Sequence, residues 1–150
     1  MNIEKKGLNI DPDNIEIWEI LSRVVSKSRK RISSELENLG IKLVELKVLF
    51  FLERDGTKSV ISLATESEVS GPWITGIVDE LERKNLVTKE RSTIDRRTVR
   101  ISITDKGKEI LSQGRLSYEE LINMALRDLS QSESEELLNI LKKISKTIGE

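Results

Sequence analysis

The sequence predicts a mostly α-helical fold with a small two- to three-stranded antiparallel sheet. Apolar residues recur every three or four positions over most of the 150 residues, which is the period of an amphipathic helix. Between residues 86 and 103 this period changes to two, as expected for strands that bury one face. A chain of this length suffices for one compact domain with helical extensions.

The first helix is predicted to begin at Asp11 and Pro12, since an acidic N-cap followed by proline is a common helix start. Its apolar spacing continues to about Leu39, and Gly40 ends it. A second helix over about residues 42–53 is apolar on almost every side, so we expect it to be buried. A turn follows at Asp55 and Gly56.

The middle of the chain predicts two short helices joined by a tight turn. Residues 57–59 form a short strand, and residues 60–67 form a helix that ends in a turn at Glu68 and Val69. Ser70 is the expected cap of the next helix, which has Pro72 in its first turn and ends at Asn85. Its apolar stripe consists of Ile74, Ile77, Val78 and Leu81.

A hairpin and two further helices complete the prediction. Strands over residues 86–91 and 98–103 flank a polar, charged tip. Thr104 caps a helix that runs to about Arg127, and Ser130 with Glu133 forms a capping box for the last helix. That helix carries a seam with the spacing of a coiled coil, made of Leu137, Leu141, Ile144 and Ile148.

Composition excludes several kinds of chemistry. The chain has no cysteine and no histidine, which removes disulfides, thiol nucleophiles, histidine bases and the common zinc sites. We therefore predict no catalytic residues, no metal site and no cofactor. No apolar run approaches the roughly 18 residues of a membrane span, and the N-terminus lacks the pattern of a signal peptide. We expect a cytoplasmic protein without membrane contact.

The net charge of −1 conceals a basic segment. Residues 82–108 carry nine basic and four acidic groups, a local charge of +5. Because charges beyond about 10 Å are screened at ordinary salt, a phosphate backbone responds to this local density. A solvated helix face is the ordinary explanation for such a cluster, but this segment alternates as strands do.

The predicted order of elements is that of a winged helix-turn-helix, in which two helices are followed by a two-stranded ribbon called the wing. A helix fits the major groove of DNA, and its first turns reach the base edges. A ribbon that carries arginine can follow the DNA backbone or enter a narrow minor groove. The sequence therefore predicts binding to double-stranded DNA.

Two stretches resemble the MarR family of transcriptional regulators. Residues 95–107 match the family's wing pattern: Asp-Arg-Arg, a strand, then a hydrophobic residue, Thr, two variable residues and Gly. Residues 63–87 resemble the family's helix-turn-helix in register. The resemblance extends over the whole chain from the first long helix to the last, and its spacing is unbroken.

The resemblance implies one MarR-type domain over residues 1–150. Residues of about 42–107 would form the DNA-binding lobe, and about 12–39 and 108–148 would form dimerisation helices. The implied function is a homodimeric, sequence-specific regulator, a repressor released by a small, aromatic anionic effector. The expected operator is pseudo-palindromic.

The resemblance also assigns residues. Those expected in the major groove are Ser70, Gly71, Pro72, Trp73, Thr75 and Gly76, although relatives often have Arg where Gly76 stands. The expected wing contacts are Lys89, Arg91, Asp95, Arg96 and Arg97, with Asp95 orienting an arginine. Lys27 and Tyr118 are placed near the effector crevice. The alternative is that Lys27 is solvated and Tyr118 lies in the core.

The groove helix itself predicts an A·T-rich operator. From Ser70 to Glu80 there is no Lys or Arg, so the common contact of these residues with guanine is absent. Hydroxyls of Ser70 and Thr75 and the apolar surfaces of Pro72 and Trp73, which suit thymine methyl groups, remain. Arginines at the wing suit a narrow A·T-rich minor groove.

Two other classes of function are less consistent with the sequence. A winged helix can dock proteins, although that role gives no reason for a basic wing. An enzyme is disfavoured: Gly56-Thr57-Lys58-Ser59 resembles the end of a phosphate loop but lacks its upstream glycine. The carboxylate pairs at residues 119–120 and 135–136 lie on predicted exposed faces, outside any pocket. Trp18 is expected to serve packing, and Trp73 either packing or DNA contact.

Overall fold

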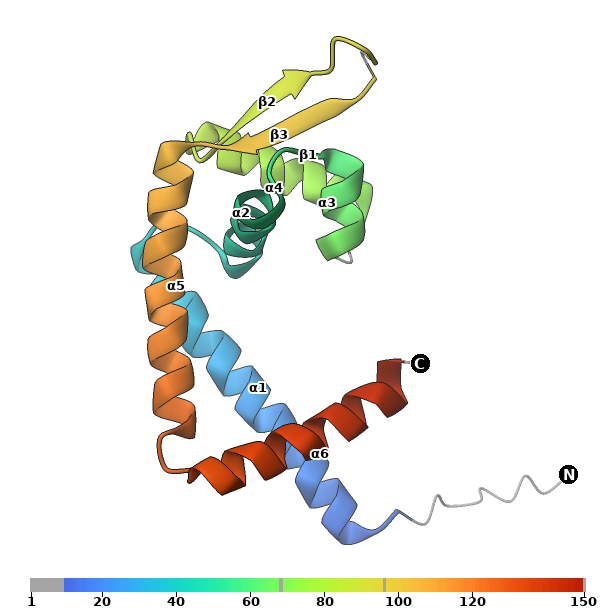
Figure 1. The fold of residues 1–150 in the computed structure, drawn as a ribbon, viewed down its shortest axis with the longest axis vertical. Coiled ribbons are helices and arrows are strands. Elements are labelled where there is room, and N and C mark those ends of the chain that lie inside the picture. The colour runs from blue at the N-terminus through green and yellow to red at the C-terminus, as the bar shows by residue number, and fades with distance from the viewer. Residues whose placement is uncertain (1–9, 68, 96, 150) are drawn as a thin grey trace, which may run out of the picture.

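The computed structural model describes residues 10–67, 69–95 and 97–149 (Figure 1). It confirms the predicted fold class, a mostly helical chain with a three-stranded antiparallel sheet. Glu68, predicted in a tight turn, and Arg96, predicted at the wing tip, lie outside the described residues. The elements in chain order are α1 (Pro12–Asn38), α2 (Leu43–Asp55), β1 (Lys58–Ser59), α3 (Val60–Ser67), α4 (Gly71–Arg83), β2 (Val87–Arg91), β3 (Val99–Ile103), α5 (Asp105–Leu126) and α6 (Gln131–Gly149).

The predicted helix caps are mostly confirmed. Asp11 accepts a hydrogen bond from the Asp13 N–H at 3.0 Å, and Thr104 accepts one from the Gly107 N–H at 3.0 Å. Ser130 and Glu133 bond reciprocally as a capping box, at 2.8 and 3.2 Å. These contacts satisfy N–H groups that a helix start leaves without partners.

The prediction that Ser70 caps α4 is correct in position but wrong for the side-chain hydrogen bond. Ser70 occupies the N-cap position of α4, but its side chain makes no capping hydrogen bond with the described backbone. A capping side chain accepts from the second or third helical N–H, and here the second residue is Pro72, which has none. The proline that favours the helix start thus removes one of the two donors that the cap needs.

The strands pair in the order β1–β3–β2, so the last strand lies in the middle. Val87 faces Ile103 and Arg91 faces Val99 in the wing, while Lys58 of β1 pairs with Ile101. Asn85 adopts a positive φ of 61° in the turn from α4 to the wing. Asparagine tolerates this conformation, which glycine often supplies at a helix end.

The core surrounds α2. Its buried residues face α3, α4 and the sheet on one side and the start of α5 on the other (Figure 1). The expected burial of this helix is therefore confirmed. The buried apolar residues are Ile32, Leu36, Ile41, Leu46, Val48, Leu49, Phe51, Leu52, Leu63, Ala64, Ile74, Ile77, Val78, Leu81, Leu86, Val87, Ile101 and Leu111.

The three long helices form an open frame below this lobe. Figure 1 shows α5 leading away from the wing, α1 beside it, and α6 crossing α1 near the far end. Only the C-terminal part of α1 is buried, through Ile32 and Leu36, and none of the described residues of α6 is buried. No helix of the described chain is long and apolar enough to cross a bilayer.

Two glycines of α5 allow close packing against the lobe. A methyl group on Gly107 would overlap the carbonyl oxygen of Leu86, and one on Gly114 would overlap the side chain of Leu46. Both glycines are buried. The first half of α5 is therefore in direct contact with the turn before the wing and with α2.

Candidate nucleic-acid interface

The outer face of α4 is free of core contacts. Ile74, Ile77, Val78 and Leu81 are buried, so the helix presents its other side to solvent, as the sequence predicted. The exposed residues on that side include Pro72, Gly76, Asp79 and Arg83. Trp73 is 54% exposed and is therefore not a core residue in this chain. Its indole surface is available at the start of the helix.

The predicted groove residues are exposed but differ in their free hydrogen-bonding groups. The Thr75 hydroxyl donates to the Gly71 carbonyl at 2.9 Å, which leaves its oxygen able to accept. The Ser70 hydroxyl takes no part in capping. A methyl group added at Gly76 would have no described neighbour within 4 Å, so packing does not require glycine there.

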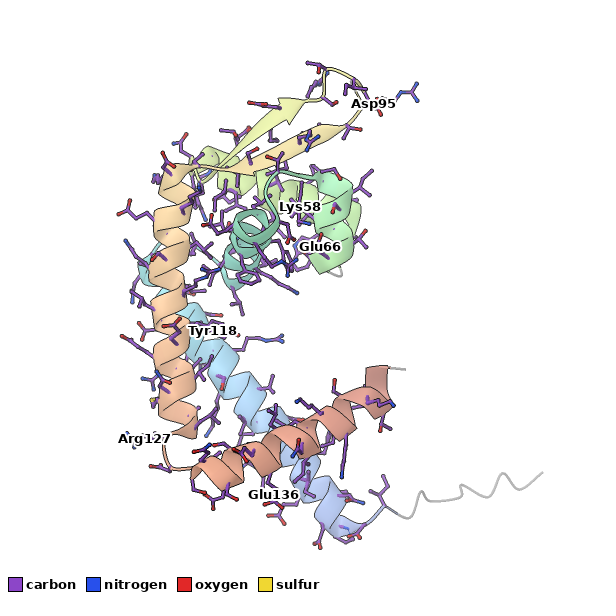
Figure 2. All side chains as sticks on the ribbon, in the orientation of Figure 1. Lys58, Glu66, Asp95, Tyr118, Arg127 and Glu136 are labelled. Carbon is purple, nitrogen blue, oxygen red and sulfur yellow. The ribbon has the colours of Figure 1, made fainter. Side chains whose placement is uncertain are left out.

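The described residues of the wing tip are linked by hydrogen bonds. The Ser92 N–H donates to the Thr98 carbonyl at 2.9 Å, and the Ser92 hydroxyl accepts from the N–H of Ile94 at 3.2 Å. Asp95 accepts from the Arg97 N–H at 2.9 Å and from the Thr98 hydroxyl at 3.2 Å. Asp95 thus holds the backbone at Arg97, and Figure 2 shows it at the end of the wing.

Several cations of the basic segment are already paired within the protein. Lys84 contacts Glu45 at 2.8 Å, Arg83 contacts Glu80 at 2.5 Å, and Lys89 is bonded to the carboxylate of Asp79. The Arg83 guanidinium lowers the pKa of Glu80 to about 2. The local charge of +5 therefore overstates what this surface offers to a phosphate.

Three arginines of the wing remain available. Arg91, Arg97 and Arg100 are exposed, and none forms an ion pair with another described residue. Arg91 and Arg97 are predicted site residues, whereas Arg100 belongs only to the predicted basic cluster. Arg91 lies on β2, Arg100 on β3 and Arg97 in the turn between them, at the end of the ribbon remote from α5 (Figure 1).

The pair between Glu45 and Lys84 was not predicted from the sequence. Glu45 is 1% exposed, and besides Lys84 it accepts from the Lys42 N–H at 2.8 Å. The one available signal is an acid within the apolar run of α2. Without Lys84, Glu45 would be a buried charge with no counter-ion, so the folded lobe depends on the pair. The contact joins the start of α2 to the end of α4. Lys84 is a structural residue of the lobe.

A hollow of about 270 Å³ lies between α4 and the wing. It brings together three predicted site residues, Thr75, Lys89 and Arg97, with Asp79. Its full lining is Ser59, Val60, Ile61, Thr75, Val78, Asp79, Lys89, Arg97, Thr98 and Val99. The hollow thus lies against both α4 and the wing.

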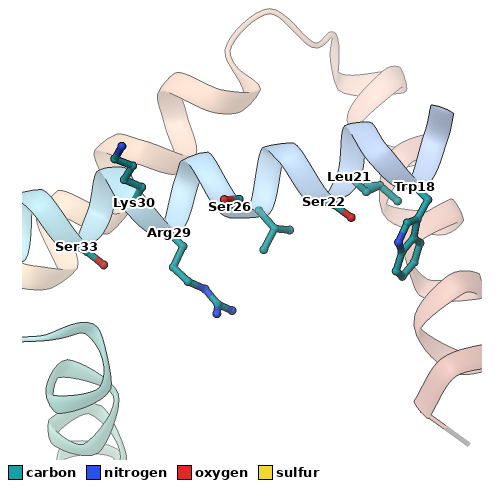
Figure 3. A pocket seen from close by; sticks show the side chains of 8 residues that line it. Trp18, Leu21, Ser22, Ser26, Arg29, Lys30 and Ser33 are labelled. Atoms are coloured by element: carbon teal, nitrogen blue, oxygen red, sulfur yellow. The ribbon is translucent and has the colours of Figure 1, made fainter. Parts of the chain in front are cut away.

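The structure does not bring Lys27 and Tyr118 into a described cavity. Both are exposed, Lys27 on α1 and Tyr118 on α5, so Tyr118 is not a core residue of the single chain. A larger hollow of about 760 Å³ follows one face of α1 instead (Figure 3). It is lined by Trp18, Leu21, Ser22, Val25, Ser26, Arg29, Lys30 and Ser33. Trp18 is exposed there and does not pack in the core.

The enzyme alternatives find no support among the described residues. Lys58 of the loop-like sequence is paired with Asp55 at 3.0 Å and with Glu66, which occupies its ammonium group. The carboxylate pairs on α5 and α6 are exposed to solvent. The described residues contain no cluster of acids that could hold a metal ion.

Taken together, an exposed helix followed by a basic two-stranded ribbon defines the winged helix-turn-helix class. Residues 41–99 match the family model described as MarR family. Among curated relatives, the chain is 32% identical to the uncharacterised regulator YfiV and 32% identical to the repressor MdtR, both of Bacillus subtilis. These alignments cover 63% and 58% of this chain, and 59% and 56% of the relatives' own lengths.

Solved structures share the fold over nearly the whole chain. YusO from Bacillus subtilis superposes with a TM-score of 0.75 at 25% identity, over 91% of this chain and 99% of that one. A mutant of E. coli MarR complexed with operator DNA gives a TM-score of 0.75 at 23% identity, over 90% and 99%. The regulator RdhR-CbdbA1625 bound to 2,4-dichlorophenol gives 0.77 at 18%, over 98% and 89%. Residues 41–99 thus match the MarR family, as the wing pattern predicted, and the fold of the rest of the chain is shared with solved structures of MarR-type regulators.

Proposed function

We propose that the protein is a cytoplasmic, non-enzymatic regulator of transcription that binds double-stranded DNA as a homodimer and represses. The observation that carries this proposal is that α4 has a free outer face and is followed by a wing with exposed Arg91, Arg97 and Arg100. The repressor MdtR and the operator complex of MarR support the assignment by similarity.

In the proposed binding mode, α4 and the wing contact different parts of the DNA. α4 enters the major groove with its first turn, where Ser70, Gly71, Pro72, Trp73, Thr75 and Gly76 are exposed. The wing lies against the backbone and minor groove, with its arginines next to phosphates. Arg96, which lies outside the described residues, is assigned to the same role from the sequence alone.

The wing assignment is tested by salt titration. Each cation removed from a phosphate contact flattens the plot of log K against log salt by about 0.9. Arg97→Ala should flatten it by about that amount on a random-sequence duplex, and Arg96→Ala with Arg97→Ala by about twice as much. Asp95→Asn should weaken binding less, because it loosens the turn without removing a cation.

Arg127→Ala is the matched control, since Arg127 is an exposed arginine at the far end of α5 (Figure 2). It should leave the slope unchanged. An unchanged slope in the wing variants would contradict the phosphate role of the wing, and binding without salt dependence in the native protein would contradict the proposed function.

The dimer rests on apolar side chains that the single chain leaves exposed. On α1, α5 and α6 they face solvent, and covering them with a second copy would bury apolar area. Such burial is the main favourable term in association. The most exposed are Ile17, Trp18, Ile20, Val24, Val25, Leu116, Leu138, Ile140 and Ile148.

Sedimentation should therefore give a dimer at micromolar concentration. Leu141→Lys, on the predicted seam of α6, should shift the protein to monomers because it places a charge in the contact. Ile61→Lys changes an equally apolar exposed residue of the lobe and should leave the dimer intact. A native protein that sediments as a monomer would overturn the assignment. A two-fold dimer should protect half-sites about 34 Å apart.

An A·T-rich operator follows from what α4 lacks, since none of its groove residues is basic. The minor groove of an I·C duplex lacks the guanine amino group, while its major groove resembles that of G·C. If the wing reads the minor groove, poly(dI·dC) should compete for the protein as well as poly(dA·dT), and several-fold better than poly(dG·dC). Equal competition by all three, or selected sites with invariant guanines opposite Pro72 to Gly76, would refute the idea.

We also propose release by an aromatic carboxylate, with Lys27 and Tyr118 as its contacts. Calorimetry with salicylate should detect binding, and Lys27→Ala should weaken it by about tenfold, the usual scale of a charge-assisted hydrogen bond. Arg29→Ala, which removes a nearby cation that lines the hollow on α1, is the control. Loss of binding in the control alone would place the ligand in that hollow, and absence of heat would refute an effector of this class.

A further inference from the structure

One ion pair joins the two elements of the proposed interface. Asp79 projects from the outer face of α4 with 57% of its side chain exposed, and Lys89 lies on β2 with 28% exposed. The Lys89 ammonium is hydrogen-bonded to Asp79, and Glu82 of α4 lies 3.7 Å from the same nitrogen. Lys89 is thus held by two acids of the helix.

The position of this pair matters for any approaching phosphate. Asp79 and Lys89 both line the hollow between α4 and the wing, together with Arg97. The two acids and Lys89 carry a combined charge of −1. The hydrogen bond to Asp79 raises the pKa of Lys89, so the pairing stabilises the charged ammonium. A phosphate at this point meets a neutralised lysine and an acidic neighbour.

Arg91, the next residue on the same face of β2, differs from Lys89 in its ion pairing. Side chains alternate along a strand, so Lys89 and Arg91 point to one side and Glu90 to the other. Arg91 forms no ion pair with another described residue, whereas Lys89 has two acidic partners. One face of β2 therefore carries Arg91, which has no ion pair with another described residue, next to Lys89, which is paired with two acids.

We infer that Asp79 competes with DNA phosphate for Lys89 and so sets the affinity of the protein for duplex DNA. This inference rests on the proposed function. Lys89 is a positioning cation of the free protein, bound to α4, and DNA obtains it only by displacing Asp79. Removal of the Asp79 charge frees one cation at the interface.

The test compares four proteins on a fluorescein-labelled random-sequence duplex: the native chain, Asp79→Asn, Lys89→Met and the double variant. Anisotropy titrations over a range of KCl give the affinity and its salt slope. Asp79→Asn should steepen the slope by about 0.9 and tighten binding by about eightfold near 0.1 M salt, the effect of one added phosphate contact. In the Lys89→Met background the same change should tighten binding less than about twofold.

Glu90→Gln is the control for charge alone, because Glu90 is an exposed acid of the same strand without an ion pair to another described residue. Glu90→Gln should tighten DNA binding as little as Asp79→Asn does in the Lys89→Met background. The inference fails if Asp79→Asn leaves the affinity unchanged, or if its gain is the same with and without Lys89 or in Glu90→Gln. A native protein without salt-dependent binding would instead refute the proposed function. Thermal melts of each variant exclude loss of fold.

Discussion

Packing against α2 is the central constraint on the lobe. The buried side chains of this helix lie against α3, α4, β3 and α5, while α3 and α4 also contact each other and β2 lies against α4. Val48, Leu49 and Leu52 are almost completely buried, so they have no tolerance for polar replacement. The buried face of α4 packs on α2, α3 and β2, which leaves its other face exposed.

The same helix also contributes the one buried carboxylate of the described core. Glu45 bonds to the Lys42 N–H at the start of α2 and to Lys84 just after α4. Hydrophobic contacts hold α4 against α2, and the ion pair with its fixed hydrogen bonds adds a directional contact at one end of both helices. Apolar packing thus stabilises the contact between α4 and α2, and a single polar contact helps to orient the two helices.

Sequence patterns that extend over a few residues were sufficient to predict the helix starts and the position of the wing. The caps at Asp11, Thr104 and Ser130 depend on residues two or three positions apart, so the sequence predicted them correctly. The change of period at Leu86 located the wing for the same reason. Ser70 failed because Pro72 removes a donor, an interaction that a cap rule applied to one residue does not consider.

Charge was less predictable, since pairing depends on the folded chain. Lys84 and Glu45 are 39 residues apart, and Lys89 reaches Asp79 across two elements. A count of basic residues therefore identified the surface but not which of its cations are free. In the same way, apolar spacing on α1 and α6 does not distinguish a face covered by the chain itself from one covered by another copy. Tyr118, considered as a core residue, is exposed in the single chain.

The two buried glycines of α5 give that helix a mechanical role. Gly107 lies against the backbone of Leu86 and Gly114 against the side chain of Leu46, so the first half of the helix is packed directly on the lobe. Its 22 residues span about 33 Å at 1.5 Å per residue. A tilt of about 5° at the far end would displace the lobe by about 3 Å, close to the rise of one base pair. Small rotations between the long helices thus translate into whole steps along a DNA groove.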